Sequence, residues 1–171
     1  MSPKSNQSRQ DAETLTTHMP KGGKSELRFW LRMLACTNMI EGEIRSRLRE
    51  QFSVTLPRFD LMSQLEREPD GLRLSDLSRR MMVTNGNVTG LIDRLERENL
   101  VDRRVSEEDR RVTFVALSAA GRAQFAEMAR EHEVWVADMF ADLSADQMDG
   151  LMELLAATKA SVQRSMAGNE E

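Results

Sequence analysis

The sequence predicts a mainly α-helical fold with one small β-hairpin, and three observations carry that prediction. Over most of the chain, apolar residues recur at spacings of three and four, which is the period of a helix with a packed face. Between Val101 and Leu117 the period changes to two, as in a pair of strands. Residues 1–24 follow neither period, so we expect them to form a disordered tail and residues 25–171 to form a single domain.

The first predicted helix, about residues 26–50, has apolar residues on two faces in its N-terminal half. The two stripes consist of Phe29, Trp30, Met33, Cys36, Ile40, Ile44 and Leu48, and of Leu27, Leu31 and Leu34. A helix at the surface of a monomer needs only one apolar face, so we expect a partner chain or a ligand to cover the second. Cys36 lies on this helix and is expected to be a small buried hydrophobic residue.

The next helix is predicted to begin near Thr55. Thr55 can cap it, and Pro57 fits its first turn, where a missing N–H costs little. The turn signal Pro69-Asp70-Gly71 ends it. The alternating residues Leu72-Arg73-Leu74 then predict a short strand.

Two helices joined by the turn Met82-Val83-Thr84 predict a helix-turn-helix. Ser75 can cap the first helix, which is expected to end at Met82. Thr84 can cap the second, which is expected to run to about Glu98. Asn99 is then a suitable residue to end that helix.

The second of these helices begins with residues suited to DNA. Its first turns carry short amide and hydroxyl side chains, namely Thr84, Asn85, Asn87 and Thr89. Asn can form two hydrogen bonds with adenine, Thr can contact the methyl group of thymine, and the free N–H groups of a helix N-terminus can meet phosphate. Gly86 and Gly90 each cost a helix about 1 kcal/mol relative to Ala. Close approach of the backbone to DNA would explain that cost.

A β-hairpin with an arginine-rich tip is predicted between Val101 and Leu117, around the polar residues 106–110. Residues 73–113 contain nine basic residues, all of them Arg, whereas residues 114–171 contain four basic and ten acidic residues. Arg forms forked contacts with phosphate and guanine, so any nucleic acid is expected to bind to the first of these segments. The tip arginines could enter the minor groove, where the potential is most negative.

Two helices are predicted after the hairpin. Ser118 can cap the first, and Ser144 with Gln147 forms a capping box at the start of the second. The first carries an apolar seam at the spacing of paired helices, formed by Phe125, Met128, His132, Trp135 and Met139. We expect these helices, about residues 118–165, to form a dimerisation region with the first helix of the chain.

Composition excludes several classes of protein. One Cys and two His, His18 and His132, cannot supply a disulfide framework or a usual zinc site. No phosphate-binding glycine loop or nucleophile motif occurs, so we expect no enzyme, no cofactor and no metal. No apolar run approaches the roughly 20 residues of a membrane span, and the N-terminus lacks the apolar core of a signal peptide. A cytoplasmic protein is expected.

The run from Val83 to Arg122 resembles the MarR family of winged-helix regulators, and the resemblance extends over about residues 27–163. It rests on Val88-Thr89, Leu91-Ile92-Asp93-Arg94-Leu95, Asn99-Leu100-Val101, Asp109-Arg110-Arg111, Leu117-Ser118 and Gly121. The resemblance implies a winged helix-turn-helix over about residues 55–117 and an obligate homodimer. It also implies a ligand pocket between the DNA-binding lobe and the dimerisation helices.

The resemblance assigns roles to individual residues. The wing motif of the family falls on Asp109, which would brace the hairpin, and on Arg111, which would reach the minor groove. Position 90, often a long basic residue in the family, is Gly here, so one DNA contact of the family is absent. The expected DNA-binding residues are Ser75, Thr84, Asn85, Asn87, Thr89, Arg94, Arg110 and Arg111, with Asp109 and Arg103 bracing the wing.

The segment upstream of the helix-turn-helix is similar to regulators of aromatic-acid and hydroxycinnamate catabolism, some of which sense aryl-CoA thioesters. The resemblance implies a repressor that binds a pseudo-palindromic operator in double-stranded DNA and is released by an aromatic acid or its CoA thioester. The expected effector pocket consists of Trp30, Met33, Leu34, Arg58, Phe59, Met62, Trp135 and Met139. Met-rich walls adapt to flat apolar ligands, and Arg58 could hold a carboxylate.

Two other functions stay open at this stage. One is a thiol-based redox switch through Cys36. Its neighbours Ala35 and Thr37 supply no charge to activate a thiol, and the peroxide-sensing branch of the family has its cysteine near the position of Leu31. The other is a winged-helix module that binds protein and not DNA.

Overall fold

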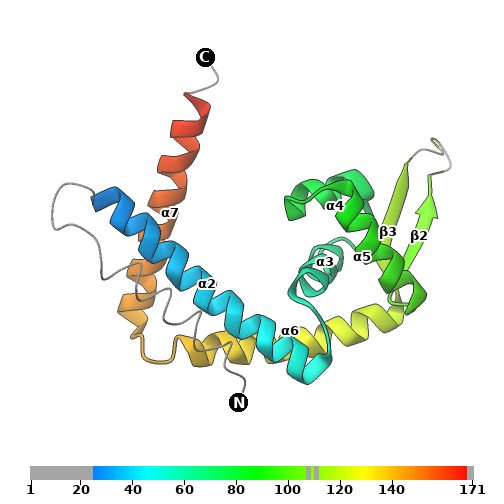
Figure 1. The fold of residues 1–171 in the computed structure, drawn as a ribbon, viewed down its shortest axis with the longest axis horizontal. Helices are drawn as coiled ribbons and strands as arrows, with labels where there is room; N and C mark the ends of the chain where they lie inside the picture. The colour runs from blue at the N-terminus through cyan, green and yellow to red at the C-terminus, as the bar shows by residue number, and fades with distance from the viewer. Residues whose placement is uncertain (1–24, 107–108, 110–111, 169–171) are drawn as a thin grey trace. The chain divides into compact units, whose positions relative to one another are not determined.

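The computed structural model describes residues 25–106, 109 and 112–168, with the side chain of Asn85 outside the description. Its elements are α2 (Ser25–Phe52), α3 (Leu56–Glu66), β1 (Leu72–Arg73), α4 (Leu74–Met81), α5 (Asn85–Arg97), β2 (Val101–Val105), β3 (Thr113–Leu117), α6 (Ala119–Met139) and α7 (Ala145–Ala167) (Figure 1). The mainly α-helical fold with one β-hairpin is therefore confirmed. The expected disordered tail, residues 1–24, lies outside the described residues. The chain divides into two compact units, one up to His132 and one from Glu133 onward.

The core of the first unit lies between three short helices and a three-stranded sheet. The antiparallel strands follow the order β1-β3-β2, with Leu72 and Arg103 both opposite Val115 in the register. The helices α3, α4 and α5 pack their apolar faces together with this sheet. The fully buried side chains of this core include Leu61, Met62, Leu65, Leu77, Val88, Ile92, Leu95 and Val115. This packing fixes α5 relative to the hairpin.

Among the three short helices α3, α4 and α5, two starts follow the sequence predictions. Thr55 and Thr84 occupy the N-cap positions of α3 and α5, although neither side chain makes a cap hydrogen bond. The expectation that Ser75 caps the following helix is wrong. The extended residue Arg73, which pairs with β3, is the N-cap of α4, so the helix begins one residue before Ser75. Strand pairing thus decided where the helix starts.

The α4–α5 connection is tighter than predicted. The helix α4 ends at Met81 and not at Met82, because Met82 has a left-handed backbone with φ 54°. That conformation reverses the chain within three residues and brings Thr84 to the start of α5. The predicted helix-turn-helix is present, with α5 agreeing with the prediction to within about one residue at each end.

The start of α6 is joined closely to the end of α5. Ser118 caps α6 as predicted, since its Oγ accepts a hydrogen bond from the Gly121 N–H at 3.0 Å. The same hydroxyl donates to the carbonyl of Asn99 at 2.7 Å. A Cβ on Gly121 would lie 1.9 Å from the carbonyl oxygen of Leu100. Only glycine therefore permits this approach of α6 to the α5–β2 connection.

The apolar seam of α6 is used differently from the prediction. Phe125 and Met128 are buried within the first unit. The ring centroid of Phe59 on α3 lies 5.5 Å from that of Phe125 and 5.1 Å from that of His132. The expectation that the whole seam serves the dimer interface is thus wrong for its first half, because α3 of the same chain covers it.

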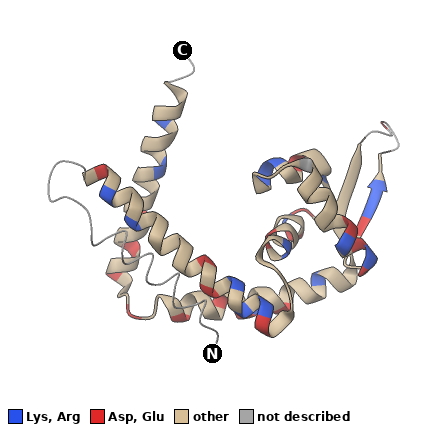
Figure 2. Ribbon diagram, in the orientation of Figure 1, with Lys and Arg blue, Asp and Glu red and all other residues tan. Residues whose placement is uncertain are grey.

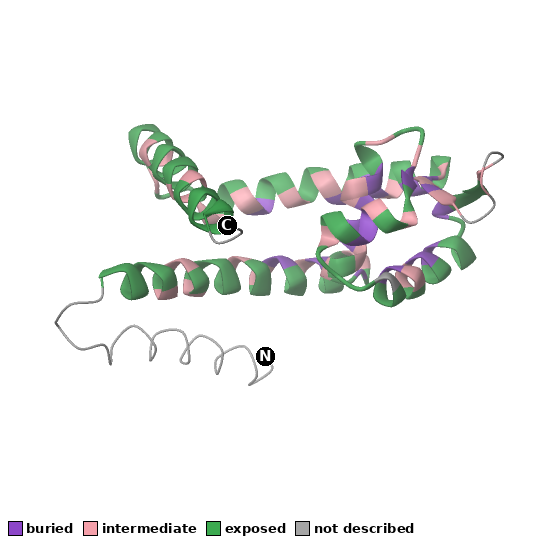
Figure 3. Ribbon diagram, turned by 90° about the horizontal axis from the view of Figure 1, so that it is seen from above, coloured by how far each residue is buried: buried purple, intermediate pink, exposed green. Residues whose placement is uncertain are grey.

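Helix α2 leaves the N-terminal half of its surface exposed. Only Ile44 and Leu48 of this helix are buried, and Trp30 is 52% exposed. Cys36 is also exposed, so its expected burial does not occur within the chain. The two-faced pattern predicted cover from outside the helix. In the structure, the described residues of the first unit leave this half uncovered (Figure 3).

The second unit consists of the end of α6 and the whole of α7. The predicted capping box starts α7: the Ser144 N–H donates to Gln147 Oε1 at 2.8 Å, and the Gln147 N–H donates to Ser144 Oγ at 3.3 Å. No residue of α7 is buried (Figure 3). Its exposed large apolar side chains are Leu151, Met152, Leu154, Leu155, Val162 and Met166. No described helix has the length and apolar character that crossing a membrane requires.

Candidate nucleic-acid interface

The N-terminal part of α5 has two contrasting faces. Val88, Ile92 and Leu95 are fully buried and fix the helix to the core. The opposite face, which includes Thr84 and Asn87, is exposed. The Thr84 side chain makes no cap hydrogen bond, so it does not compete for the N–H groups of the first turn. This end of α5 is suited to hydrogen bonds with phosphate groups and with the edges of DNA bases.

The described residues do not require glycine at either of the two glycine positions of α5. Both Gly86 and Gly90 are exposed. A Cβ placed on either would meet none of the described residues within 4 Å. Their helix penalty is therefore not offset by close packing of the described residues. A surface that another molecule approaches closely would give them a function.

The strand β2 is attached to α5 through one arginine. Arg103 Nε donates to Glu96 Oε2 at 3.0 Å, and its Nη2 donates to Asp93 Oδ1. Both carboxylates belong to α5, so the guanidinium spans the helix surface and joins it to the hairpin. The wing-bracing role expected of Arg103 is consistent with these contacts, and Figure 2 shows the basic residues along β2.

The hairpin is closed by short contacts near its tip. The Ser106 N–H donates to the carbonyl of Val112 at 2.9 Å, and the Val112 N–H donates to the carbonyl of Asp109 at 2.9 Å. The Asp109 N–H also donates to Ser106 Oγ at 3.4 Å. Arg110 and Arg111, the expected minor-groove residues, lie outside the described residues.

The outer face of the sheet carries a feature that sequence reasoning missed. The register places Arg73 on β1 and Arg104 on β2 beside Phe114 on β3. Their guanidinium carbons lie 5.7 and 5.8 Å from the ring centroid. Cation–π contact of this kind holds a guanidinium in a fixed orientation. The alternation of β3 put Phe114 on the outer face, but only the pairing of three strands showed its neighbours.

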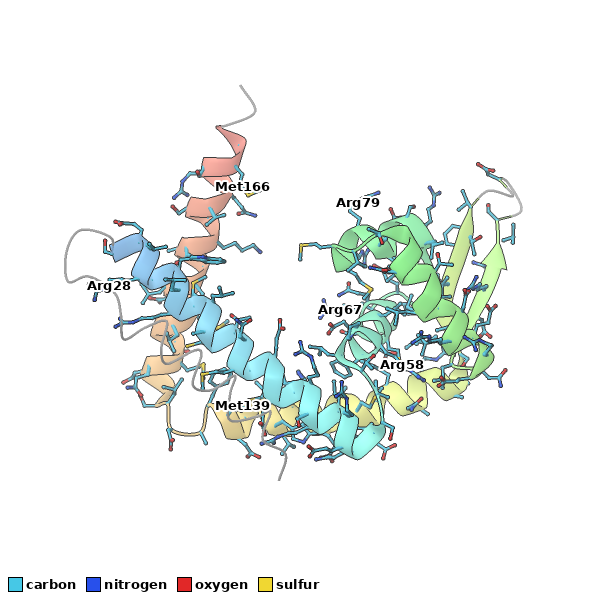
Figure 4. The ribbon with its side chains drawn as sticks, viewed as in Figure 1. Arg28, Arg58, Arg67, Arg79, Met139 and Met166 are labelled. Atoms are coloured by element: carbon cyan, nitrogen blue, oxygen red, sulfur yellow. The ribbon has the colours of Figure 1, made fainter. Side chains whose placement is uncertain are left out.

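The remaining expected DNA-binding residues lie on the same two helices. Ser75 is exposed on α4, Arg94 is exposed on α5, and Thr89 is half-buried. Arg79, on α4, projects away from the lobe (Figure 4) and pairs with Asp76 at 3.1 Å. Asn85 belongs to α5 by its backbone alone. The helix-turn-helix thus carries Ser75, Thr84, Asn87 and Arg94 on one structural unit.

The expected effector residues occupy different environments. On α3, Phe59 and Met62 are buried in the core of the first unit, where they pack against their own chain. Arg58 is engaged by Glu98, with Nη1 to Oε1 at 2.9 Å. On α2, Trp30 and Leu34 are exposed and Met33 is half-buried. The last two, Trp135 and Met139, belong to the second unit, in which Trp135 is buried and Met139 half-buried.

The family model described as MarR family matches residues 54–113. The similarity to the MarR family therefore covers about a third of the chain. The matched residues include the helix-turn-helix and most of the wing. The rest of the chain, including α6 and α7, lies beyond the matched segment.

Relatives and solved structures that are similar to this chain include MarR family regulators. The transcriptional activatory protein BadR of Rhodopseudomonas palustris is 33% identical over 56% of this chain and 55% of its own length. The structure of a MarR family transcriptional regulator from Silicibacter pomeroyi is 28% identical, has a TM-score of 0.70, and matches 84% of this chain and 99% of that one. The structure of Streptococcus pneumoniae FabT in complex with DNA is 22% identical, has a TM-score of 0.68, and matches 81% and 97%.

The similarity to the curated relatives covers only part of their length. The chain spans between 54% and 62% of the length of the first curated relatives it matches. The names of those relatives describe transcriptional regulators, which agrees with the expectation that the chain is not an enzyme. In the described residues, no group of three or more His, Cys, Asp or Glu is arranged to hold a metal ion.

Proposed function

We propose that this chain is a DNA-binding transcriptional regulator that inserts α5 into the major groove and presents its wing to the adjacent minor groove. The observation that carries the proposal is the exposed polar N-terminal face of α5, a helix that Arg103 joins to the hairpin. A helix of this kind fits the major groove, where Asn and Thr side chains can reach base edges. A structural relative bound to DNA supports the same use of the fold.

The proposal includes a homodimer. The exposed apolar residues of α2 and α7 are the support, because soluble monomers rarely expose contiguous apolar faces of this kind. A second copy of the chain offers the same apolar helices in return, as a two-fold interface requires. Two recognition helices related by two-fold symmetry would bind a pseudo-palindromic site with half-sites about one helical turn apart.

DNA binding is tested with an operator selected from random double-stranded DNA and measured by fluorescence anisotropy at several salt concentrations. We expect affinity to fall steeply with salt, because phosphate contacts release counterions. Asn87→Ala should change sequence preference, Arg111→Ala should weaken binding to every sequence, and Asp109→Ala should weaken it through the wing. Affinity independent of salt, or no binding at all, would favour a module that binds protein.

The regulatory signal is proposed to be an aromatic acid or its CoA thioester acting on a repressor. The support is the similarity of the upstream segment to regulators of aromatic-acid catabolism, together with the Met and Trp residues of α2 and α6. The relative BadR is named as an activatory protein, so the direction of regulation needs its own measurement.

The effector class is tested by titrating free aromatic acids, their CoA thioesters and unrelated metabolites against the protein–operator complex. Release by aromatic compounds, with a change in Trp fluorescence, is the expected result. Release by unrelated metabolites alone, or by none, discards the effector class and leaves DNA binding intact. Reporter expression from the operator then separates a repressor from an activator.

A further inference from the structure

One ion pair joins two helices of the lobe that lie far apart in sequence. Arg58 is the third residue of α3, and Glu98 is the C-cap residue of α5. The two terminal nitrogens of the guanidinium fork onto the two carboxylate oxygens, with Nη1 to Oε1 at 2.9 Å and Nη2 donating to Oε2. In Figure 4, Arg58 projects from α3 on the side of the C-terminal end of α5.

The pair is more than a surface contact. The side chain of Arg58 is only 17% exposed. Its Nε is buried and has no hydrogen-bond partner among the described residues. A charged group withdrawn from water in this way depends on its carboxylate partner, and Glu98 is the one found among the described residues. Loss of Glu98 would therefore leave a largely buried cation without that compensation.

Both charges lie at the helix end that disfavours them. Arg58 is in the first turn of α3, where the helix dipole favours anions, and Glu98 ends α5, where the dipole favours cations. Exchange of the two residues would give each helix its preferred charge. The helix dipoles therefore do not account for this arrangement. What the pair provides is a connection between α3 and α5.

The pair completes the attachment of α5. Arg103 of the wing forms ion pairs with Asp93 and Glu96, and Arg58 of α3 forms one with Glu98. The next residue of α3, Phe59, packs against Phe125 of α6 in a tilted ring contact. The recognition helix is thus held through one guanidinium to the wing and through another to the α3–α6 layer.

We infer that Arg58 is a positioning residue for DNA recognition, which acts through Glu98 to set the orientation of α5. The inference rests on the proposed DNA-binding function. It gives Arg58 a role within the lobe in place of the effector contact expected from the sequence. A shift of α3 against α6 would reach α5 through this pair, and no DNA contact by Arg58 is required.

The test compares Glu98→Gln, Arg58→Lys and the exchanged variant Arg58→Glu/Glu98→Arg with the wild type on selected operator and on random DNA. We expect Glu98→Gln to weaken operator binding about tenfold, as in a typical coupling between sites, with a much smaller change on random DNA. The salt dependence should not change, because no phosphate contact is lost. The exchanged variant should recover most of the affinity.

The control is Glu43→Gln, which removes the carboxylate from the similarly exposed Arg47–Glu43 pair on α2. It should leave the preference for operator over random DNA unchanged. Circular dichroism melting shows whether each variant folds. If Glu98→Gln does not fold, Arg58→Lys, which keeps the charge and loses the fork, replaces it.

Three results overturn the inference. They are an unchanged operator preference in Glu98→Gln and Arg58→Lys, an equal loss on both DNAs with a smaller salt slope, and failure of the exchanged variant to recover. The second result would show that the variants lose phosphate contacts and not the orientation of α5. Absence of DNA binding by the wild type refutes the proposed function itself and is distinct from all three.

Discussion

The winged helix-turn-helix lobe, about residues 55–117, buries many of its apolar side chains, whereas the last helix, α7, leaves its own exposed. In the lobe, Leu61, Leu77, Ile92 and other apolar residues from separate elements are fully buried against one another. In α7 no residue is buried, and Leu154 is 68% exposed. Burial of apolar surface is the main favourable term in folding. The lobe therefore obtains its stability from its own chain, whereas α7 has an apolar surface that we interpret as half of an interface.

The strongest way to break this comparison is to put charge on the exposed face of α7. Leu151→Glu combined with Leu155→Glu should dissociate the dimer, because burying an uncompensated carboxylate in an interface costs several kcal/mol, roughly 3–5 kcal/mol for an unpaired charge. Operator affinity should fall with it. Analytical ultracentrifugation measures the oligomer and anisotropy measures DNA binding.

Glu153→Gln is the control for this experiment, since it changes the charge of α7 without affecting an apolar residue. It should remain dimeric. A double glutamate variant that stays dimeric at micromolar concentration would assign the interface to a different surface and leave the exposed face of α7 unexplained.

Two glycines sharpen the comparison between packed and open helices. Gly121→Ala should destabilise the protein by roughly 3 kcal/mol or more, because its Cβ would lie 1.9 Å from the backbone oxygen of Leu100. Gly150→Ala, in α7, meets no described residue within 4 Å and should stabilise its helix by about 0.5–1 kcal/mol. Urea unfolding gives both values. Equal effects at the two sites would contradict the close approach at Gly121.

The open glycine of α5 separates stability from binding. Gly90→Ala should raise the free energy of unfolding by about 0.5–1 kcal/mol, as for any exposed helical glycine. Operator affinity should nevertheless fall several-fold, because the new methyl group would lie on the surface proposed to approach DNA. Urea unfolding and anisotropy are measured on the same preparation. A variant that gains stability and keeps its affinity would show that DNA does not approach this position.

The smallest expected effect concerns Asp60 on α3. Partial burial, together with the charge of Glu41 on α2, raises the pKa of Asp60 above 3.8. The folded state then binds the carboxyl proton of Asp60 more readily than the unfolded state does. Above the raised pKa, the ionised carboxylate therefore lowers the free energy of unfolding. This loss of stability disappears as the pH falls through the raised pKa. Asp60→Asn should stabilise the protein at pH 7 by a few tenths of a kcal/mol, the size of an exposed charge effect.

Urea midpoints measured from pH 7 downward check the sign. The difference between Asp60→Asn and the wild type should shrink as the pH approaches 3.8. Glu66→Gln, an exposed residue on the same helix, supplies the baseline for removing a carboxylate. If the stability gained by Asp60→Asn does not depend on pH, its cause is an effect other than the charge of Asp60.

Some features of the candidate site could be predicted from the sequence because they depend on local contacts. The period of the apolar residues predicted α5 and the hairpin, and the pair Ser144 and Gln147 predicted the start of α7. Ser75 failed as a cap because Phe114 and Val115 of β3, 39 and 40 positions further on, pair with Arg73 and Leu72 just before it. The capping rule considers neighbours in sequence, and here the neighbour in space decided.

The sequence by itself determined the elements, the helix-turn-helix and the polar surface of α5, since helical and strand periods follow from backbone geometry over a few residues. Only the tertiary structure decided how Arg58, Arg103 and the seam of α6 are used. Arg58 pairs with a carboxylate 40 residues away, and the first half of the seam packs on α3 of the same chain. An arginine or an apolar stripe predicts that a partner exists. Which partner it meets depends on the packing of the whole lobe, because contacts between distant segments form only when those segments are folded together.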